Sequence, residues 1–133
     1  MKIGGLVFQI TTIAVFLQLL LGGLLTFDFI NAGVHIVAGL VVFVLAIVAM
    51  IVSFVSRPRS KSLQLTSVVL VVLIIIQIVL GFNTLKTGNQ VIAWIHFANA
   101  MVIYGVAIAG TFVALRLGQT DKVLPSAKGM LRE

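Results

Sequence analysis

The sequence predicts an all-α integral membrane protein: a four-transmembrane-helix bundle built from two parallel two-helix repeats. The first observation is composition. Of the 133 residues, 61% are hydrophobic and only 9% are charged, whereas roughly a quarter of the residues in soluble proteins are charged. The second is that the apolar residues form four runs, each long enough for the roughly 20 residues that a spanning helix needs. The third is an internal repeat that relates the first two runs to the last two.

The four predicted helices cover residues 5–27, 33–55, 63–85 and 91–115, and they form one transmembrane domain, 1–117. Short connectors rich in Gly, Asn, Asp and Ser separate them, as is typical of turns. The first run is too long for a cleavable signal peptide, and no small-residue cleavage site follows it. Residues 118–133 are more polar and are predicted to form a short cytoplasmic tail.

Charge predicts the topology. Of the nine Lys and Arg residues, only Lys86 lies in a connector on the side opposite to the others. This asymmetry is the positive-inside pattern, so both termini are expected in the cytoplasm of a multi-pass plasma-membrane protein surrounded by the lipid bilayer. Topology accounts for the basic excess, and no nucleic-acid partner is expected. The cations on the cytoplasmic side are Lys2, Arg57, Arg59, Lys61, Arg116, Lys122, Lys128 and Arg132.

The repeat is visible in two motifs, QLLLG at 18–22 and QIVLG at 77–81. Each motif is followed by a connector and then by a helix with a single histidine, His35 or His96, near its start. Residues three before and four, eleven and fourteen after each histidine lie on one helix face. All of them are small: Ala32, Gly39, Ala46 and Ala49 in the first half, and Ala93, Ala100, Ala107 and Gly110 in the second.

Small residues on one helix face also have a simple explanation, because helices in lipid associate through them. Two such faces in register with two histidines suggest a role beyond helix packing. Parallel repeats are related by an axis along the membrane normal, which would bring His35 and His96 to the same depth. We then expect the two imidazoles to face each other across a gap lined by small residues, among them Gly39 and Ala100.

That arrangement suits haem, whose iron accepts two histidine nitrogens. The chain has no cysteine, which excludes disulfides, thiolate metal sites and a c-type haem. Zinc would need four ligands, and two histidines without a third strong donor favour a porphyrin, which brings its own nitrogens. We therefore predict one haem b ligated by His35 and His96. The alternative is that each histidine hydrogen-bonds to a loop or lies at the interface.

Further polar residues surround the predicted site. Lys86 either pairs with a haem propionate or is a solvated loop lysine. Gln18 and Gln77 recur in register and either hydrogen-bond across helices or reach the haem edge. Asn99 breaks the repeat, since its counterpart is Ala38, and it either orients a ligand or bonds to a neighbouring helix.

A helix ending in QIVLG, a short connector and a helix opening with IAWIHFANA together resemble the haem A synthase (CtaA-like) family. The resemblance covers residues 8–116, one four-helix half of the usual eight-helix fold. It implies that His35 and His96 match one of that family's haem-ligand pairs, and that a homodimer would restore eight helices. The family's active half carries a glutamate three residues before a ligand histidine, where this chain has Ala32 and Ala93.

These observations lead to one functional prediction and two alternatives. The prediction is a b-type cytochrome that exchanges electrons with quinol or a terminal oxidase near the outer membrane face, because iron with two histidine ligands has no open position for oxygen. The first alternative is a minimal haem A synthase-like enzyme acting on haem, although the catalytic glutamate is not matched; haem O or haem A would then be bound in place of haem b. The second is a haem-free accessory subunit of a respiratory complex.

Overall fold

The computed structural model describes residues 3–56 and 59–130, with side chains up to residue 119. It contains four helices: α1 (Ile3–Thr26), α2 (Ala32–Val55), α3 (Lys61–Thr87) and α4 (Gln90–Met130). Each is long and apolar enough to cross a membrane. A helix satisfies its backbone hydrogen bonds within itself, which is the condition for stability in lipid. For the described residues, the prediction of four such helices is confirmed.

Side chains in the connectors define where the helices begin. The side-chain oxygen of Asn31 accepts a hydrogen bond from the Val34 N–H at the start of α2, at 3.1 Å. Ser60 caps α3 in the same way, and Asn89 accepts from the first N–H groups of α4. These bonds use donors that would otherwise lack partners at a helix start. Gly88 ends α3 in the left-handed conformation, with φ of 61°.

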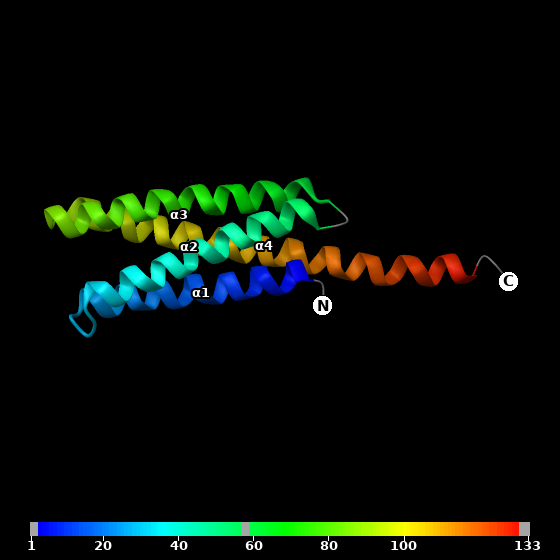
Figure 1. Ribbon diagram of the computed structural model, residues 1–133, viewed down its shortest axis with the longest axis horizontal. Helices are drawn as coiled ribbons and strands as arrows, with labels where there is room; N and C mark the ends of the chain where they lie inside the picture. Colours follow the sequence, from blue (N-terminus) through cyan, green and yellow to red (C-terminus); the bar gives the residue numbers. More distant parts are fainter. Residues whose placement is uncertain (1–2, 57–58, 131–133) are drawn as a thin grey trace.

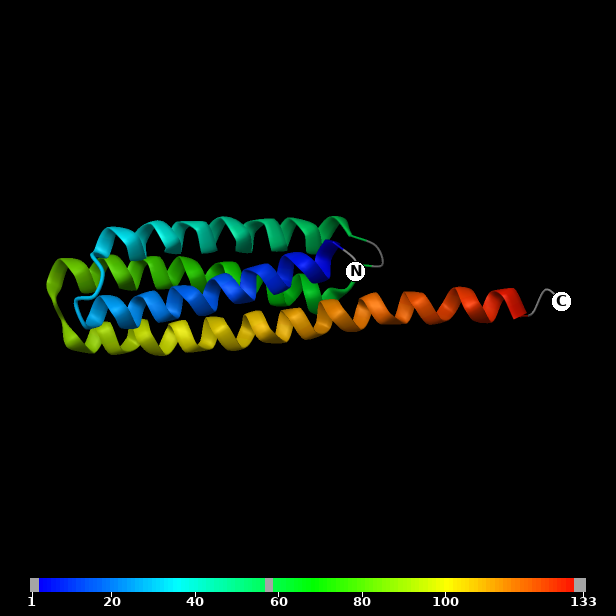
Figure 2. The same ribbon diagram turned by 90° about the horizontal axis from the view of Figure 1, so that it is seen from below.

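The last helix is longer than the sequence predicted. α4 runs to Met130, and its candidate membrane span covers Gln90–Gln119. Among the described residues positive φ angles occur only at Asp28 and Gly88, so Gly118 does not terminate the helix. The end of α4 therefore projects beyond the other three helices (Figures 1 and 2). Three of the cations on which the predicted topology depends lie outside the described residues: Lys2, Arg57 and Arg132.

The four helices form an up-and-down bundle. Each packs against its neighbours in sequence, and α1 also packs against α4. Within the described residues the diagonal pairs, α1 with α3 and α2 with α4, make no comparable contact. The N-terminus and the α2–α3 loop share one end of the bundle, while the α1–α2 and α3–α4 loops share the other (Figures 1 and 2).

We call the half next to the N-terminus and the α2–α3 loop the packed half, because its small residues fit closely against large ones. A Cβ built on Gly110 of α4 would lie 2.6 Å from a ring carbon of Phe8, which is fully buried. Hydroxyl pairs join the helices here, Thr12 with Thr111 at 2.9 Å and Ser53 with Ser67 at 2.8 Å. The core consists of Phe8, Val15, Val42, Ala46, Ala49, Leu63, Leu70, Val71, Ile74, Ile103, Ala107 and Ala114.

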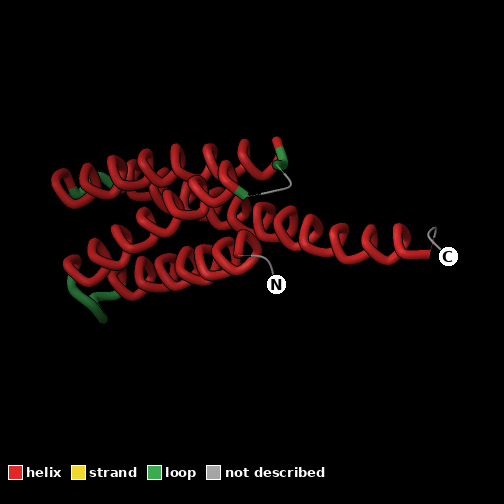
Figure 3. Tube along the Cα trace, turned by 45° about the vertical axis from the view of Figure 1, so that its right-hand side comes forward, coloured by secondary structure: helices red, strands yellow, loops and turns green. Residues whose placement is uncertain are grey.

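We call the other half, which contains His35 and His96, the histidine half. Here the α1–α2 pair and the α3–α4 pair diverge toward the α1–α2 and α3–α4 loops (Figures 1 and 3). No residue of α2 before Val42 or of α4 before Ile103 is buried. The histidine half therefore encloses a cavity instead of a core.

Candidate functional site

The cavity of the histidine half has a volume of about 730 Å³ and is lined by residues of all four helices. Its inner wall is a layer of four buried β-branched side chains, one from each helix: Val15, Val42, Ile74 and Ile103. Val42 and Ile103 stand seven residues after His35 and His96, two turns deeper along the same helix face. The layer separates the cavity from the packed half.

The mouth of the cavity lies at the end with the α1–α2 and α3–α4 loops. Exposed large side chains line this part, among them Phe27, Leu85 and Trp94. The Trp94 ring meets the Phe97 ring edge to face, with centroids 6.3 Å apart. The lining is apolar with a few polar groups, which is typical of cofactor sites, and its volume falls within their usual range of roughly 300–1,000 Å³.

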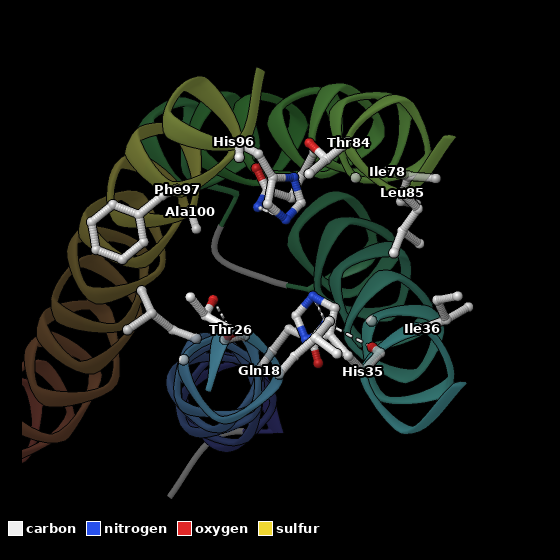
Figure 4. Close-up of a pocket in the computed structure, with 18 of the residues that line it drawn as sticks. Gln18, Thr26, His35, Ile36, Ile78, Thr84, Leu85, His96, Phe97 and Ala100 are labelled. Carbon is white, nitrogen blue, oxygen red and sulfur yellow. Dashed lines mark hydrogen bonds between the residues drawn. The ribbon is translucent and has the colours of Figure 1, made fainter. Parts of the chain in front are cut away.

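His35 and His96 face each other across this cavity (Figure 4). Their ring centroids are 6.4 Å apart, with an angle of 67° between the ring planes. The two residues belong to α2 and α4, the helices on one diagonal of the bundle, so their side chains bridge a space that the helix backbones leave open. Both side chains are half-buried.

Each imidazole fits against a neighbouring helix at a glycine. A Cβ built on Gly22 of α1 would lie 3.3 Å from Cε1 of His35, and one built on Gly81 of α3 would lie 3.0 Å from Cε1 of His96. A side chain at either position would push the ring away by a few tenths of an ångström. These glycines are the last residues of the two repeated motifs, QLLLG and QIVLG.

The first residue of each motif, a glutamine, contacts the same histidine. Gln18 Nε2 lies 3.3 Å from both ring nitrogens of His35 and donates a 2.9 Å hydrogen bond to the His35 carbonyl oxygen. Gln77 Nε2 lies 3.2 Å from Nε2 of His96. The two glutamines thus hydrogen-bond across helices, the first of the two roles predicted for them, and both also line the cavity.

The remaining predicted residues divide into two groups. Gly39 and Ala100 line the cavity one turn below the histidines, and a Cβ on Gly39 would lie 2.9 Å from Gln18 Nε2. Asn99 lies outside the lining and bonds to the neighbouring helix, donating to Gln77 Oε1 at 2.7 Å and to the Leu73 carbonyl at 3.1 Å. Lys86 is exposed in the last turn of α3, and the lining does not include it.

Gly22 and Gly81 are site residues that the sequence analysis did not assign. The signal was present, because a residue four positions after a glutamine lies on the same helix face. The glutamine and the glycine of each motif therefore form one notch in the helix surface. The glutamine amide lies on one side of the notch, and on the other side the glycine leaves the helix backbone uncovered. We call these the α1 notch (Gln18 and Gly22) and the α3 notch (Gln77 and Gly81).

The separation of the two rings suits a metal held by two imidazoles. With metal–nitrogen bonds of ~2.0 Å and ring atoms about 1.1 Å from the ring centre, two imidazoles on opposite sides of one metal place their centroids about 6.2 Å apart. The observed separation is 6.4 Å. Among the described residues no group of three His, Cys, Asp or Glu side chains is close enough to hold a metal ion, so a metal here needs its other donors from elsewhere, as a porphyrin supplies them.

Two buried polar atoms of the site have no hydrogen-bond partner: Nδ1 of His96 and Oε1 of Gln18. Buried polar groups are nearly always satisfied in native proteins, so these atoms beside the cavity suit a ligand with polar groups or a bound water.

Comparisons with models of known protein families, with curated proteins and with solved structures found no match.

Proposed function

We propose that this chain is a membrane-embedded b-type cytochrome that holds one haem between His35 and His96. The observation that carries the proposal is the pair of imidazoles facing each other across a cavity, with ring centroids 6.4 Å apart. Supporting it are the matched α1 and α3 notches, which fit two halves related by an axis along the bundle. The resemblance to a four-helix half of the haem A synthase family also favours haem binding.

Electron transfer is the chemistry that this donor set favours. Haem with two histidine ligands exchanges electrons without an open position for oxygen. The chain's own residues would bind the macrocycle at the two imidazoles, clear space for it at Gly39 and Ala100, and exclude water with an apolar lining. We place the site near the outer face of the plasma membrane, with both termini in the cytoplasm and with quinol or a terminal oxidase as the redox partner.

Optical spectroscopy tests the proposal. Protein purified in mild detergent from haem-replete cells should show the sharp reduced-minus-oxidised bands of a low-spin b haem. His35→Ala and His96→Ala should each abolish those bands, because each removes a ligand. Thr12→Ala, which removes a hydroxyl pair in the packed half, should retain them. Recovery of the bands when imidazole is added to His96→Gly would separate loss of a ligand from loss of the fold.

A second candidate is a haem-free accessory subunit of a respiratory complex. The Gln18 and Gln77 contacts favour it, since both histidines hydrogen-bond across helices without any cofactor. Colourless protein from haem-replete cells that co-purifies with oxidase subunits would support this candidate and contradict the cytochrome.

A minimal haem A synthase has less support from the site. Proton removal in an oxidation of a haem methyl group calls for a positioned base such as a carboxylate, and the described residues that line the cavity include no Asp or Glu. Extraction of haem O or haem A from the purified protein would nonetheless favour the enzyme.

A further inference from the structure

The two histidines differ in how firmly their rings are held. On the α3 side, four groups form a chain of hydrogen bonds that starts at the Leu73 carbonyl. Asn99 Nδ2 donates to this carbonyl at 3.1 Å and to Gln77 Oε1 at 2.7 Å. Gln77 Nε2 then lies 3.2 Å from His96 Nε2. We call Asn99 and Gln77 the relay.

The relay determines which ring nitrogen of His96 carries the hydrogen. A backbone carbonyl can only accept, so Asn99 must present its NH₂ group to Leu73 and, with the same group, to Gln77 Oε1. Gln77 is thereby left with its NH₂ group facing His96. His96 Nε2 must accept that hydrogen bond, and in a neutral imidazole the hydrogen is then on Nδ1. This Nδ1 is the buried atom that has no partner.

The first half of the chain has no relay. The counterpart of Asn99 is Ala38, which has no side-chain donor. Gln18 gives its short hydrogen bond, 2.9 Å, to the His35 backbone carbonyl, and its amide nitrogen is equally far, 3.3 Å, from both ring nitrogens. The His35 carbonyl can only accept, so Gln18 turns its NH₂ group toward His35, and its Oε1 has no partner among the described residues. Because that NH₂ group is equally far from both ring nitrogens, either nitrogen can accept from it, and His35 can adopt either tautomer.

We propose that the relay makes His96 the exchangeable haem ligand and His35 the firmly bound one. Binding of iron by His96 Nε2 requires that nitrogen to leave Gln77. Binding by Nδ1 requires the hydrogen to move to Nε2 and the Gln77 amide to turn against Asn99. Either change costs His96 its 3.2 Å hydrogen bond from Gln77. Binding of iron by His35 costs only one of two longer contacts, 3.3 Å each, with the Gln18 amide, which keeps its 2.9 Å hydrogen bond to the His35 carbonyl. A small neutral ligand such as carbon monoxide should consequently displace His96 before His35.

The assignment of His96 as the exchangeable ligand rests on the proposed haem site, but the hydrogen bonds of the relay can be tested without haem. The experiment is ¹⁵N-histidine NMR of the haem-free protein in detergent. We expect His96 to show one tautomer with the hydrogen on Nδ1, and His35 to show a mixture. Asn99→Ala should convert His96 to a mixture while leaving the His35 signals in place. A hydrogen on Nε2 of His96, or equal behaviour of the two rings, would overturn the relay.

The second experiment is a carbon monoxide titration of the reduced, haem-loaded protein. Gln77→Leu removes the competitor for His96 Nε2, so His96 should hold the iron more firmly and carbon monoxide affinity should fall about five-fold, the factor expected for one net hydrogen bond. The matched change Gln18→Leu should have a smaller effect. A rise in affinity in Gln77→Leu would contradict the inference, since it would mean that the amide supports ligation.

The outcomes for the relay and for the cytochrome are distinguishable. Colourless protein would refute the haem site but leave the NMR result standing. A low-spin b haem together with unchanged carbon monoxide affinity in Gln77→Leu would support the cytochrome but contradict the proposal that His96 is the exchangeable ligand. Thermal unfolding of each variant shows whether the substitution has disturbed the bundle.

Discussion

The packed half and the histidine half use the same faces of α2 and α4 in opposite ways. In the packed half Ala46 and Ala107 are fully buried against neighbouring helices. Gly39 and Ala100 lie on the same faces, two turns nearer to the α1–α2 and α3–α4 loops, and line a cavity. Small residues thus allow close helix packing at one end of the bundle and leave room for a ligand at the other.

The difference shows that small residues do not by themselves determine whether helices meet. In lipid, helix association depends on van der Waals packing and interhelical hydrogen bonds. The packed half has large partners for its small residues, such as Phe8 against Gly110. In the histidine half each imidazole fits into the notch of the other helix in its own pair, His35 into the α1 notch and His96 into the α3 notch.

The largest contrast in stability is expected from one substitution made at two positions of α4. Ala107→Leu inserts a large side chain into a filled core and should lower the free energy of unfolding by about 1–3 kcal/mol. Ala100→Leu places the same side chain into the cavity, where the stability should be retained or raised. Thermal unfolding in detergent measures both, and equal losses would contradict the distinction between the two halves.

The same two substitutions should also differ in their effect on haem binding. Ala100→Leu should lose the b-haem absorption because the new side chain occupies space below His96, whereas any folded Ala107→Leu protein should keep it. The readout is the ratio of haem absorbance to protein in the purified samples. Full haem content in Ala100→Leu would indicate that the cavity is not where the haem binds.

Glycine substitutions should give smaller effects of opposite sign. Gly110→Ala collides with the buried Phe8 ring, and this overpacking exceeds the gain in helix propensity, leaving a net loss of about 1 kcal/mol. Gly39→Ala displaces the terminal amide of Gln18, which donates to the His35 carbonyl. Weakening of that hydrogen bond should offset part of the propensity gain, leaving a net stabilisation of about 0.5 kcal/mol. Melting temperatures that fall in both variants would contradict this difference.

The smallest effect is expected at the hydroxyl pair of the packed half. Ser53→Ala removes the 2.8 Å contact to Ser67, but Ser67 still donates to the Gln64 carbonyl. Interhelical hydrogen bonds in membrane proteins contribute about 0.6 kcal/mol on average, so unfolding should shift by about that amount. Haem absorption should not change, and a large loss of haem here would show that the two halves are energetically coupled.

Much of the fold was predictable from the sequence because hydropathy and helix length are set by the membrane. The predicted 33–55 differs from α2 by one residue at its start. Hydrogen bonding across helices was one of the two roles predicted for Gln18 and Gln77 from their matched positions, and the structure shows it. The extension of α4 to Met130 was not predicted, since Gly118 was compatible with either a helix or a turn.

The site was predictable only in part. Matched spacing placed His35 and His96 at one level, but spacing along a helix does not reveal how far opposite helices diverge, so the volume of the cavity required the structure. Asn99 could have faced a ligand or a neighbouring helix, and only the packing of α4 on α3 selected the helix. Lys86 was the single connector cation on its side, yet it lies exposed in the last turn of α3 and is not among the residues that line the cavity.

The central claim is that the histidine half holds one haem between two imidazoles. Titration of haem-free protein in detergent with haemin tests it most directly, with absorption spectra recorded at each addition. The account predicts a low-spin spectrum that saturates at one haem per chain and that is lost in both His35→Ala and His96→Ala. Non-saturating binding, or a spectrum unchanged by either substitution, would contradict it.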